Sequence, residues 1–181
     1  SLYHGETYDA RLECPGWDSP GLDASDWKPV EVVTDFLLPV PEACQPIRVT
    51  QEVKAVSLTE PKPRTYVFDF GQNLPGRTRL RVEGPEGTIV QIRHAEVLND
   101  DGTIYTENYR SARATDVYIL KGGGAEEYEP RFTYRGFRYA ELTGFPGTPD
   151  KGALVARVVH TDAPVIGSFE CSEDILNRIQ R

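Results

Sequence analysis

Cysteine is scarce in this sequence of 181 residues, and methionine is absent. The three cysteines, Cys14, Cys44 and Cys171, are odd in number and widely spaced, which excludes a disulfide framework and a CxxC metal site. We interpret them as structural thiols. The sequence opens on Ser1 without an initiating methionine and without a charged segment followed by an apolar one, as a signal peptide would have. We therefore expect a fragment of a longer protein.

Long apolar runs are missing as well. The longest, VFDF and ALVARVV, are far shorter than the roughly 20 residues that cross a membrane as a helix. The net charge of -8 and the pI of about 4.9 argue, on bulk charge alone, against a nucleic-acid partner. The composition, 39% hydrophobic, fits a soluble globular protein, and it leaves open whether that protein is cytoplasmic or secreted. We expect no membrane partner and no nucleic-acid partner.

Helical periodicity is rare, and strand signals take its place. Seven alternating or β-branched runs are separated by turn residues such as EPKP, GPEG, NDDG and KGGG. No helical pattern of 10–15 residues lies between them, which argues against a parallel βαβ sheet. The sequence therefore predicts an all-β fold, an antiparallel β-sandwich or jelly roll, with an irregular N-terminal segment and a short C-terminal helix.

Two predicted strands carry finer detail. In GRTRLRVEG, Arg77, Arg79 and Arg81 share one parity, so we expect a solvated stripe opposite a buried one. In RFTYRGFRYAEL, the aromatic residues change parity midway. A one-residue bulge at Arg135–Gly136 would bring all of them to one face, and glycine tolerates a bulge well. We predict a bulge there, and a turn at GQNLPG between two separate strands.

The two ends differ from the middle. DASDW, at 23–27, predicts a turn whose Trp27 anchors against the body, and LLPVPEACQP, at 37–46, predicts a proline-bounded connector. In SFECSEDILNRIQR, at 168–181, the period changes to that of a helix: Ser172 is a good N-cap, and Ile175, Leu176 and Ile179 form an apolar stripe. We predict a short helix there.

The densest polar stretch is IRHAEVLNDDGTIYTENYR, at 92–110. An EF-hand loop with Gly102 at position 6 would place Val97 at position 1 and Asn108 at position 12, so both end ligands fail. Asp101–Gly102 is instead a strong hairpin-turn signal. His94 and Glu96 lie two apart on one strand face, but no second histidine is near in sequence and no PCxxC follows, so we expect no metal and no cofactor.

Other catalytic patterns are absent or unresolved. GxSxG and GK[ST] do not occur, which removes the usual signs of a nucleophile elbow and of a phosphate loop. The carboxylates Glu96, Glu107 and Asp116 could approach one another if their strands are neighbours, although inverting glycosidases need a separation of about 6.5–9.5 Å. In DFGQN, Asp69, Gln72 and Asn73 could recognise sugar hydroxyls or only satisfy turn backbone.

Aromatic residues that could stack on a sugar ring are also present. About half of them should belong to the core, because a sandwich buries alternate positions. The candidates are Tyr105, Tyr109, Tyr134 and Tyr139.

A long central block now identifies a resemblance. GETYDAR (5–11), GWDSPGLDASDWKPV (16–30), residues 66–122 from YVFDFGQNLPG to YILKG, YEPRFTYRGFRYAELTGFPG (128–147) and GSFECSEDILNRI (167–179) occur in an order that resembles bacterial α-L-rhamnosidases. These are multidomain inverting glycoside hydrolases. The resemblance implies three parts: residues 1–45 close a galactose-binding-like region, 46–162 form a concanavalin-like β-sandwich, and 163–181 enter a six-hairpin α-toroid.

The resemblance places the general acid and base of the family in that toroid, so no catalytic residue is expected in this chain. The partners it implies are the toroid of the parent and a rhamnose-containing glycoside or polysaccharide. Two alternatives stay open: a carbohydrate-binding module, and a self-sufficient enzyme using His94, Glu96 and Glu107. The residues expected to face sugar or the toroid are Asp69, Gln72, Asn73, His94, Glu96, Tyr105, Asn108, Arg110 and Arg135.

Overall fold

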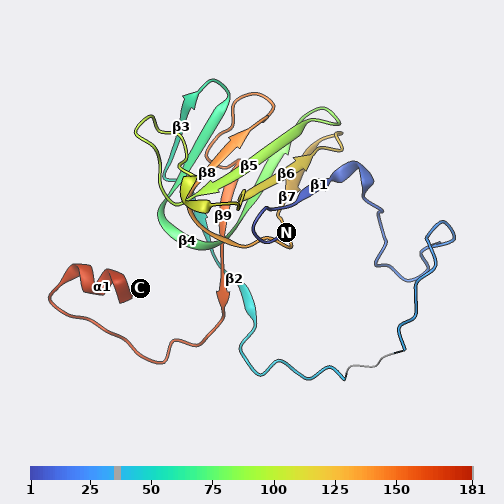
Figure 1. The fold of residues 1–181 in the computed structure, drawn as a ribbon, viewed down its shortest axis with the longest axis horizontal. Coiled ribbons are helices and arrows are strands. Elements are labelled where there is room, and N and C mark those ends of the chain that lie inside the picture. The colour runs from blue at the N-terminus through green and yellow to red at the C-terminus, as the bar shows by residue number, and fades with distance from the viewer. Residues whose placement is uncertain (35–37, 181) are drawn as a thin grey trace.

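A computed structural model describes residues 1–34 and 38–180 (Figure 1). Nine strands form one continuous, strongly curled sheet. Two 3-10 turns, Ala10–Leu12 and Glu107–Tyr109, and the helix α1 (Asp174–Gln180) complete the chain. The strands are β1 (Thr7–Asp9), β2 (Ile47–Lys54), β3 (Ser57–Lys62), β4 (Thr65–Glu83), β5 (Ile89–Ala95), β6 (Thr115–Ile119), β7 (Ala125–Tyr128), β8 (Arg135–Thr143) and β9 (Leu154–Thr161). Within these residues, the one α-helix is too short to cross a membrane.

The long strand β4 makes the sheet close on itself. Its first half pairs with β3 and β8, whereas its second half pairs with β9 and β7. The strand order β1-β6-β5-β8-β4-β9-β2 therefore runs through β4 from one layer into the other. All pairs are antiparallel except β1 with β6. The predicted all-β sandwich is confirmed.

The space between the layers holds an aromatic and aliphatic core. Phe68, Phe70 and Phe137 are buried, and the rings of Phe70 and Phe137 meet edge to face with centroids 5.7 Å apart. Each such ring contributes about 2–3 kcal/mol by leaving water. Leu80 is fully buried, whereas Arg79 beside it in β4 reaches solvent and pairs with carboxylates. The predicted alternation of this strand is thus confirmed.

Two predictions about strand boundaries are wrong. GQNLPG is no turn between strands, because β4 continues through it. The irregularity lies in β4 and not at Arg135–Gly136: between the pairs Asp69↔Tyr139 and Leu74↔Phe137, β4 advances five residues while β8 advances two. The extra length bulges out of β4. Phe132 precedes β8 and is 84% exposed, so the aromatic residues of that run do not share one face.

The N-terminal residues join the sandwich, and the next segment leaves it. β1 lies parallel to Val117–Ile119 at the edge of the sheet. The DASDW turn forms as predicted, with Ser25 N–H donating to Asp23 at 3.0 Å. Trp27 is 54% exposed, so the prediction that it anchors against the body is wrong. The connector prediction begins at Leu37, which lies outside the described residues with 35 and 36.

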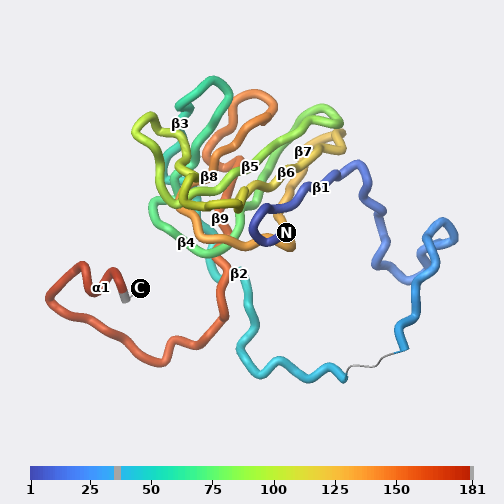
Figure 2. The backbone as a smooth tube through the Cα atoms, viewed as in Figure 1, coloured from blue at the N-terminus to red at the C-terminus, as the bar shows by residue number. Residues whose placement is uncertain are grey.

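Both flanks run away from the sandwich as extended chain (Figure 2). After β9 the chain passes Val165 and Ile166, which are exposed, and reaches the predicted helix α1. The side chain of Asn177 bonds both backbone groups of Cys171, at 2.8 Å and 2.7 Å, and so closes the turn that leads into the helix. Leu176 and Ile179 remain exposed on α1.

Candidate functional site

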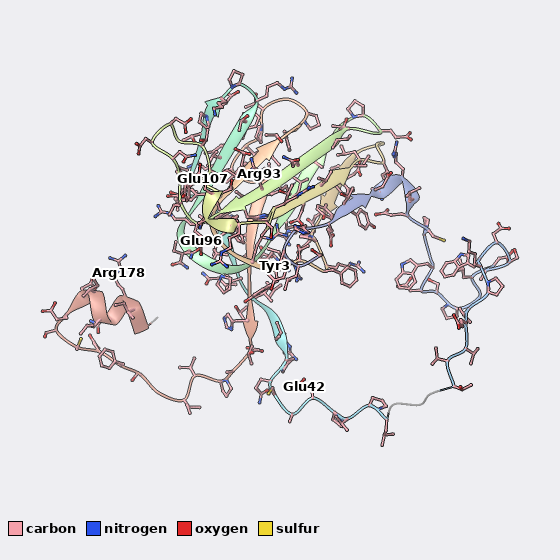
Figure 3. The ribbon with its side chains drawn as sticks, viewed as in Figure 1. Tyr3, Glu42, Arg93, Glu96, Glu107 and Arg178 are labelled. Carbon is pink, nitrogen blue, oxygen red and sulfur yellow. The ribbon has the colours of Figure 1, made fainter. Side chains whose placement is uncertain are left out.

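The polar stretch 92–110 forms a hairpin tip and not a strand pair along its length. Gly102, at φ 80°, donates its N–H to Asn99 O at 3.0 Å, and Leu98 bridges to Ile104. The predicted turn is confirmed. The segment that follows the turn pairs only briefly with the first strand, because residues 107–109 form a 3-10 turn. Figure 3 labels Arg93 in β5, Glu96 directly after that strand and Glu107 in the 3-10 turn.

His94 points into the core, where it cannot exchange protons with a substrate. It is fully buried, and its ring lies 4.8 Å from that of Phe137 in an edge-to-face contact. The guanidinium of Arg135 is 3.0 Å from Nδ1. Because an arginine always donates, Nδ1 accepts, and Nε2–H donates to Thr78 Oγ1 at 3.1 Å. Burial first, and the charge of Arg135 second, lower the pKa of His94 to about 3.

Arg135 connects His94 to a buried carboxylate. Its second terminal nitrogen is 3.1 Å from Asp116 Oδ1, which also accepts the N–H of Glu6 at 3.2 Å. Burial raises the pKa of Asp116, and the charge of Arg135 opposes that rise. The chain Thr78–His94–Arg135–Asp116 is therefore an internal polar network that ties β4, β5, β6 and β8 together. Self-sufficient catalysis by a His94 base is not compatible with this geometry.

Glu96 lines a small hollow above that network. β5 ends at Ala95, so Glu96 leaves the strand and is exposed, and Asn73 donates to it at 2.9 Å. Burial, then the charge of Glu96, raises the pKa of Tyr109. We call this hollow, of about 300 Å³, the Glu96 cavity. It is lined by Leu2, Tyr3, Glu96, Tyr109, Ala112, Ala114, Tyr134, Arg135 and Gly136.

The remaining predicted residues do not join the Glu96 cavity. Asp69 accepts both arms of Arg138, at 2.8 Å and 2.9 Å, and the N–H of Gly71 at 2.7 Å. The bond from Arg138 is the main cause that lowers the pKa of Asp69. Gln72 and Asn108 are exposed and Tyr105 is half-buried. Of the nine predicted residues, the structure brings together Asn73 with Glu96 and His94 with Arg135, and it places Glu96 and Arg135 in the lining of one cavity.

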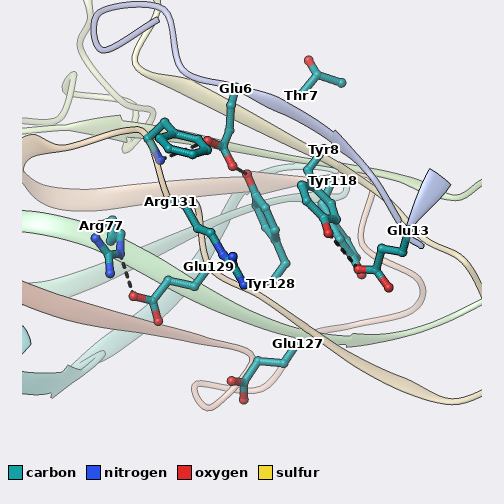
Figure 4. Close-up of a pocket in the computed structure, with 11 residues that line it drawn as sticks. Glu6, Thr7, Tyr8, Glu13, Arg77, Tyr118, Glu127, Tyr128, Glu129 and Arg131 are labelled. Carbon is teal, nitrogen blue, oxygen red and sulfur yellow. Dashed lines mark hydrogen bonds and ion pairs between the residues drawn. The ribbon is translucent and has the colours of Figure 1, made fainter. Parts of the chain in front are cut away.

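Sequence reasoning missed a second hollow, of about 550 Å³, in which three tyrosines gather (Figure 4). Tyr118 and Tyr128 stack with centroids 4.7 Å apart, and Tyr8 lies 5.9 Å from Tyr118. Tyr8, from β1, is far from the other two in sequence. Tyr118 and Tyr128 each occupy a buried position of an alternating strand, which is a local sequence signal. Only the parallel pairing of β1 with β6 brings Tyr8 to them.

Each of these tyrosines donates to its own glutamate. The pairs are Tyr8 with Glu13 at 2.9 Å, Tyr118 with Glu126 at 2.7 Å and Tyr128 with Glu6 at 2.9 Å. Burial is the main cause that raises the pKa of Tyr118 and of Tyr128. In Tyr118 the hydrogen bond to Glu126 is the second cause. The three phenols of this hollow thus each have a carboxylate partner within the protein, which is typical of a structural network.

Metal ligands do not cluster in the described part of the chain. Across residues 1–34 and 38–180, no group of three His, Cys, Asp or Glu side chains is placed to hold an ion. Asp101 instead accepts from the N–H and the hydroxyl of Thr103, at 3.0 Å and 2.5 Å. The Asp101 carboxylate of the NDDG turn therefore accepts hydrogen bonds from within the turn itself.

Comparisons with known proteins agree with this fold. A family model described as the bacterial alpha-L-rhamnosidase concanavalin-like domain matches residues 59–160, and one described as the alpha-L-rhamnosidase N-terminal domain matches residues 1–51. An alpha-L-rhamnosidase of Streptomyces avermitilis is 52% identical over 180 residues, which is 98% of this chain and 18% of that protein. One of Formosa agariphila is 40% identical over 99% of this chain and 20% of its own length.

Solved structures give the same picture. The crystal structure of Streptomyces avermitilis alpha-L-rhamnosidase complexed with L-rhamnose superposes with a TM-score of 0.93 at 52% identity, over 99% of this chain and 18% of that one. Alpha-L-rhamnosidase from Dictyoglumus thermophilum gives 0.88 at 45% identity, over 98% and 20%. The chain thus spans about a fifth of the length of the relatives it matches.

Proposed function

The chain belongs to the bacterial α-L-rhamnosidase family, as its N-terminal and concanavalin-like region, and from this we propose that its parent hydrolyses terminal α-L-rhamnosyl groups with inversion. The observation that carries the proposal is the 52% identity across 98% of the chain to an alpha-L-rhamnosidase. The chain itself is the non-catalytic sandwich. The catalytic carboxylates belong to the α-toroid of the parent.

The sandwich docks on that toroid through its flanks. Residues 14–34 and 163–179 expose several large apolar side chains, among them Trp17, Val30, Val165 and Ile166. Apolar side chains gathered on extended segments signal a surface that another part of a protein covers. We divide the parent into three parts. Residues 1–45 close the region before the sandwich and lend the edge strand β1 to its sheet, residues 46–162 form the sandwich, and residues 163–181 enter the toroid.

The test compares the chain with the full-length parent on an aryl α-L-rhamnoside. We expect no turnover by the chain and release of L-rhamnose by the parent, with the inverted anomer seen first by proton NMR. Turnover by the chain that Glu96→Gln abolishes would overturn the assignment. The retained anomer as first product would contradict inversion.

A second candidate function is sugar binding at the Glu96 cavity. Its volume of about 300 Å³ reaches the lower end of small-molecule sites, and it combines aromatic rings with a carboxylate and an amide. A titration with L-rhamnose checks it: saturable shifts that disappear in Tyr134→Ala support the module, and the exposed Phe132→Ala is the matched control. Rhamnose-independent amide spectra would contradict it.

A further inference from the structure

A third hollow, of about 590 Å³, collects positive charge in a chain whose net charge is negative. Three arginines line it: Arg93 from β5, and Arg110 and Arg113 from the loop between the hairpin tip and β6. We call it the arginine pocket. It adjoins the three-tyrosine hollow at the start of β1, because Glu6 and Thr7 line both.

The charges in the arginine pocket are unequally satisfied. Arg93 pairs with the buried Glu141 at 3.2 Å, so its charge is compensated. The carboxylate of Glu6 accepts hydrogen bonds from the Tyr128 hydroxyl and from the N–H of Phe132 in the neighbouring hollow. Arg110 and Arg113 make no ion pair within 4 Å among the residues that the structure describes. Two guanidinium forks are therefore left for an outside anion.

Arg110 occupies a backbone position that favours glycine. Its φ of 56° and ψ of -112° are those of the first central residue in a type II′ turn, and Ala112 N–H closes that turn onto Tyr109 O at 2.9 Å. An arginine there costs free energy that a glycine would avoid. Backbone strain of this kind clusters at binding and catalytic sites, which makes Arg110 a candidate binding residue because it also lines the pocket.

The walls of the arginine pocket are fixed by close backbone contact. Thr115 N–H donates to His4 O at 3.2 Å, and Val117 N–H donates to Glu6 O at 2.9 Å. Gly5 permits this approach, since a Cβ there would stand 1.7 Å from Thr115 O. A binding site on such a wall is preorganised, so little ordering entropy opposes a ligand.

We propose that the arginine pocket binds the oxyanion of an acidic saccharide, either a uronate carboxylate or a sulfate ester. Its volume lies in the range of sites that hold small molecules, well above the needs of one inorganic ion. Gln91 and Thr7 line it and supply partners for sugar hydroxyls. This inference rests on the proposed glycan-cleaving parent and narrows its substrate to acidic rhamnose-containing glycans.

The test titrates the ¹⁵N-labelled chain at low salt with D-glucuronate, D-glucose 6-sulfate and neutral D-glucose. We expect saturable shifts of the amides of residues 106–117 with at least one acidic sugar and none with D-glucose. Added salt should weaken the binding. The two acidic probes distinguish a carboxylate site from a sulfate site.

Variants separate binding from folding. Arg110→Gly should weaken the acidic sugar about tenfold. The same variant should raise Tm by about 2 °C, because the turn is relieved. Arg113→Gln should also weaken binding about tenfold while keeping the turn. Arg48→Gln, which alters an exposed arginine of β2 paired with Asp162, is the matched control and should bind as the wild type does.

Several outcomes would overturn the inference. One is that D-glucose shifts the amides as strongly as the acidic sugars do. Another is that both arginine variants bind the acidic sugars with unchanged affinity. The third is that neither acidic sugar shifts any amide. A response to hexaglutamate alone would assign the arginine pocket to protein contact instead. Failure of the two proposals can be told apart. A parent that cleaves aryl rhamnoside while the chain ignores both acidic sugars sinks only this inference, and binding without cleavage by the parent sinks only the enzymatic assignment.

Discussion

Lowering the pH should destabilise the sandwich through His94, and His94→Gln should remove that effect. In the folded chain His94 is buried, accepts from Arg135 and has a pKa of about 3. A solvated histidine in the unfolded chain has a pKa near 6.5. Between these values the unfolded chain binds a proton that the folded chain refuses, so stability falls as the pH falls.

The magnitude follows from the size of the shift. Each pH unit between about 6 and 4 should cost roughly 1.4 kcal/mol of unfolding free energy. Over the whole interval from 6.5 to about 3 this reaches about 5 kcal/mol, a large part of what a domain has. Asp116 acts with the opposite sign, because burial raises its pKa and its folded form takes up a proton first. Asp116 is present in the wild type and in His94→Gln, so its contribution is common to the two stability curves.

The assay is urea unfolding at pH 7, 6, 5 and 4, followed by circular dichroism. Tryptophan fluorescence would report the wrong region, since Trp17 and Trp27 are exposed and lie outside the core. His94→Gln will be less stable at pH 7, because it loses the contact with Phe137. Its stability should then fall less steeply with pH than that of the wild type, by about 1.4 kcal/mol per unit. Parallel curves for the two proteins would refute the reasoning.

Three further predictions use matched variants. Phe68→Ala should cost about 3–5 kcal/mol of unfolding free energy because the ring is fully buried, whereas Phe132→Ala, at an exposed ring, should stay within about 0.5 kcal/mol; urea titration distinguishes them. Gly5→Ala should release β1 and speed amide exchange along β6, since its Cβ would meet a carbonyl at 1.7 Å, and Gly123→Ala, equally positive in φ but in open space, should leave β6 protected. Asp69→Asn should cost about 1 kcal/mol at pH 7 and less as the pH falls through the lowered folded pKa of Asp69, and a pH-independent cost would contradict this.

The sequence predicted the elements whose signal is local. Strand alternation in GRTRLRVEG and the turn at Asp101–Gly102 depend on neighbours in the chain, and both are confirmed. The C-terminal helix is also confirmed. The antiparallel sandwich followed from many short strands without intervening helices. These features need only propensity and period, which a single sequence contains.

The errors concern features that depend on partners. Gly71 and Gly76 suggested a turn, yet β4 continues because β8 and β9 supply its hydrogen bonds on both sides. The change of parity among the aromatic residues predicted a bulge at Arg135–Gly136 in β8, but the extra residues lie in the opposite strand, β4. Trp27 was predicted to anchor against the body, but it is 54% exposed among the described residues. Which strand bulges, and what covers an aromatic ring, is decided by tertiary pairing.

The candidate site shows the same division more sharply. His94 and Glu96 are two apart and were expected on one strand face, but β5 ends between them, so one is fully buried and the other exposed. The polar density of residues 92–110 therefore splits between an internal network and a surface.

What distinguishes a binding surface here is unpaired charge, and sequence does not show pairing. In the three-tyrosine hollow every phenol has its own glutamate and Arg77 has Glu129 at 2.6 Å, so that among the described residues Arg131 is left as the single arginine of its lining without an ion pair. A ligand entering there would have to compete with bonds already made. In the arginine pocket, within the described residues, Arg110 and Arg113 have no acidic partner to give up. An anion can therefore bind there without breaking an existing pair, which is why this hollow, and not the more aromatic one, is the site that we propose for the acidic saccharide.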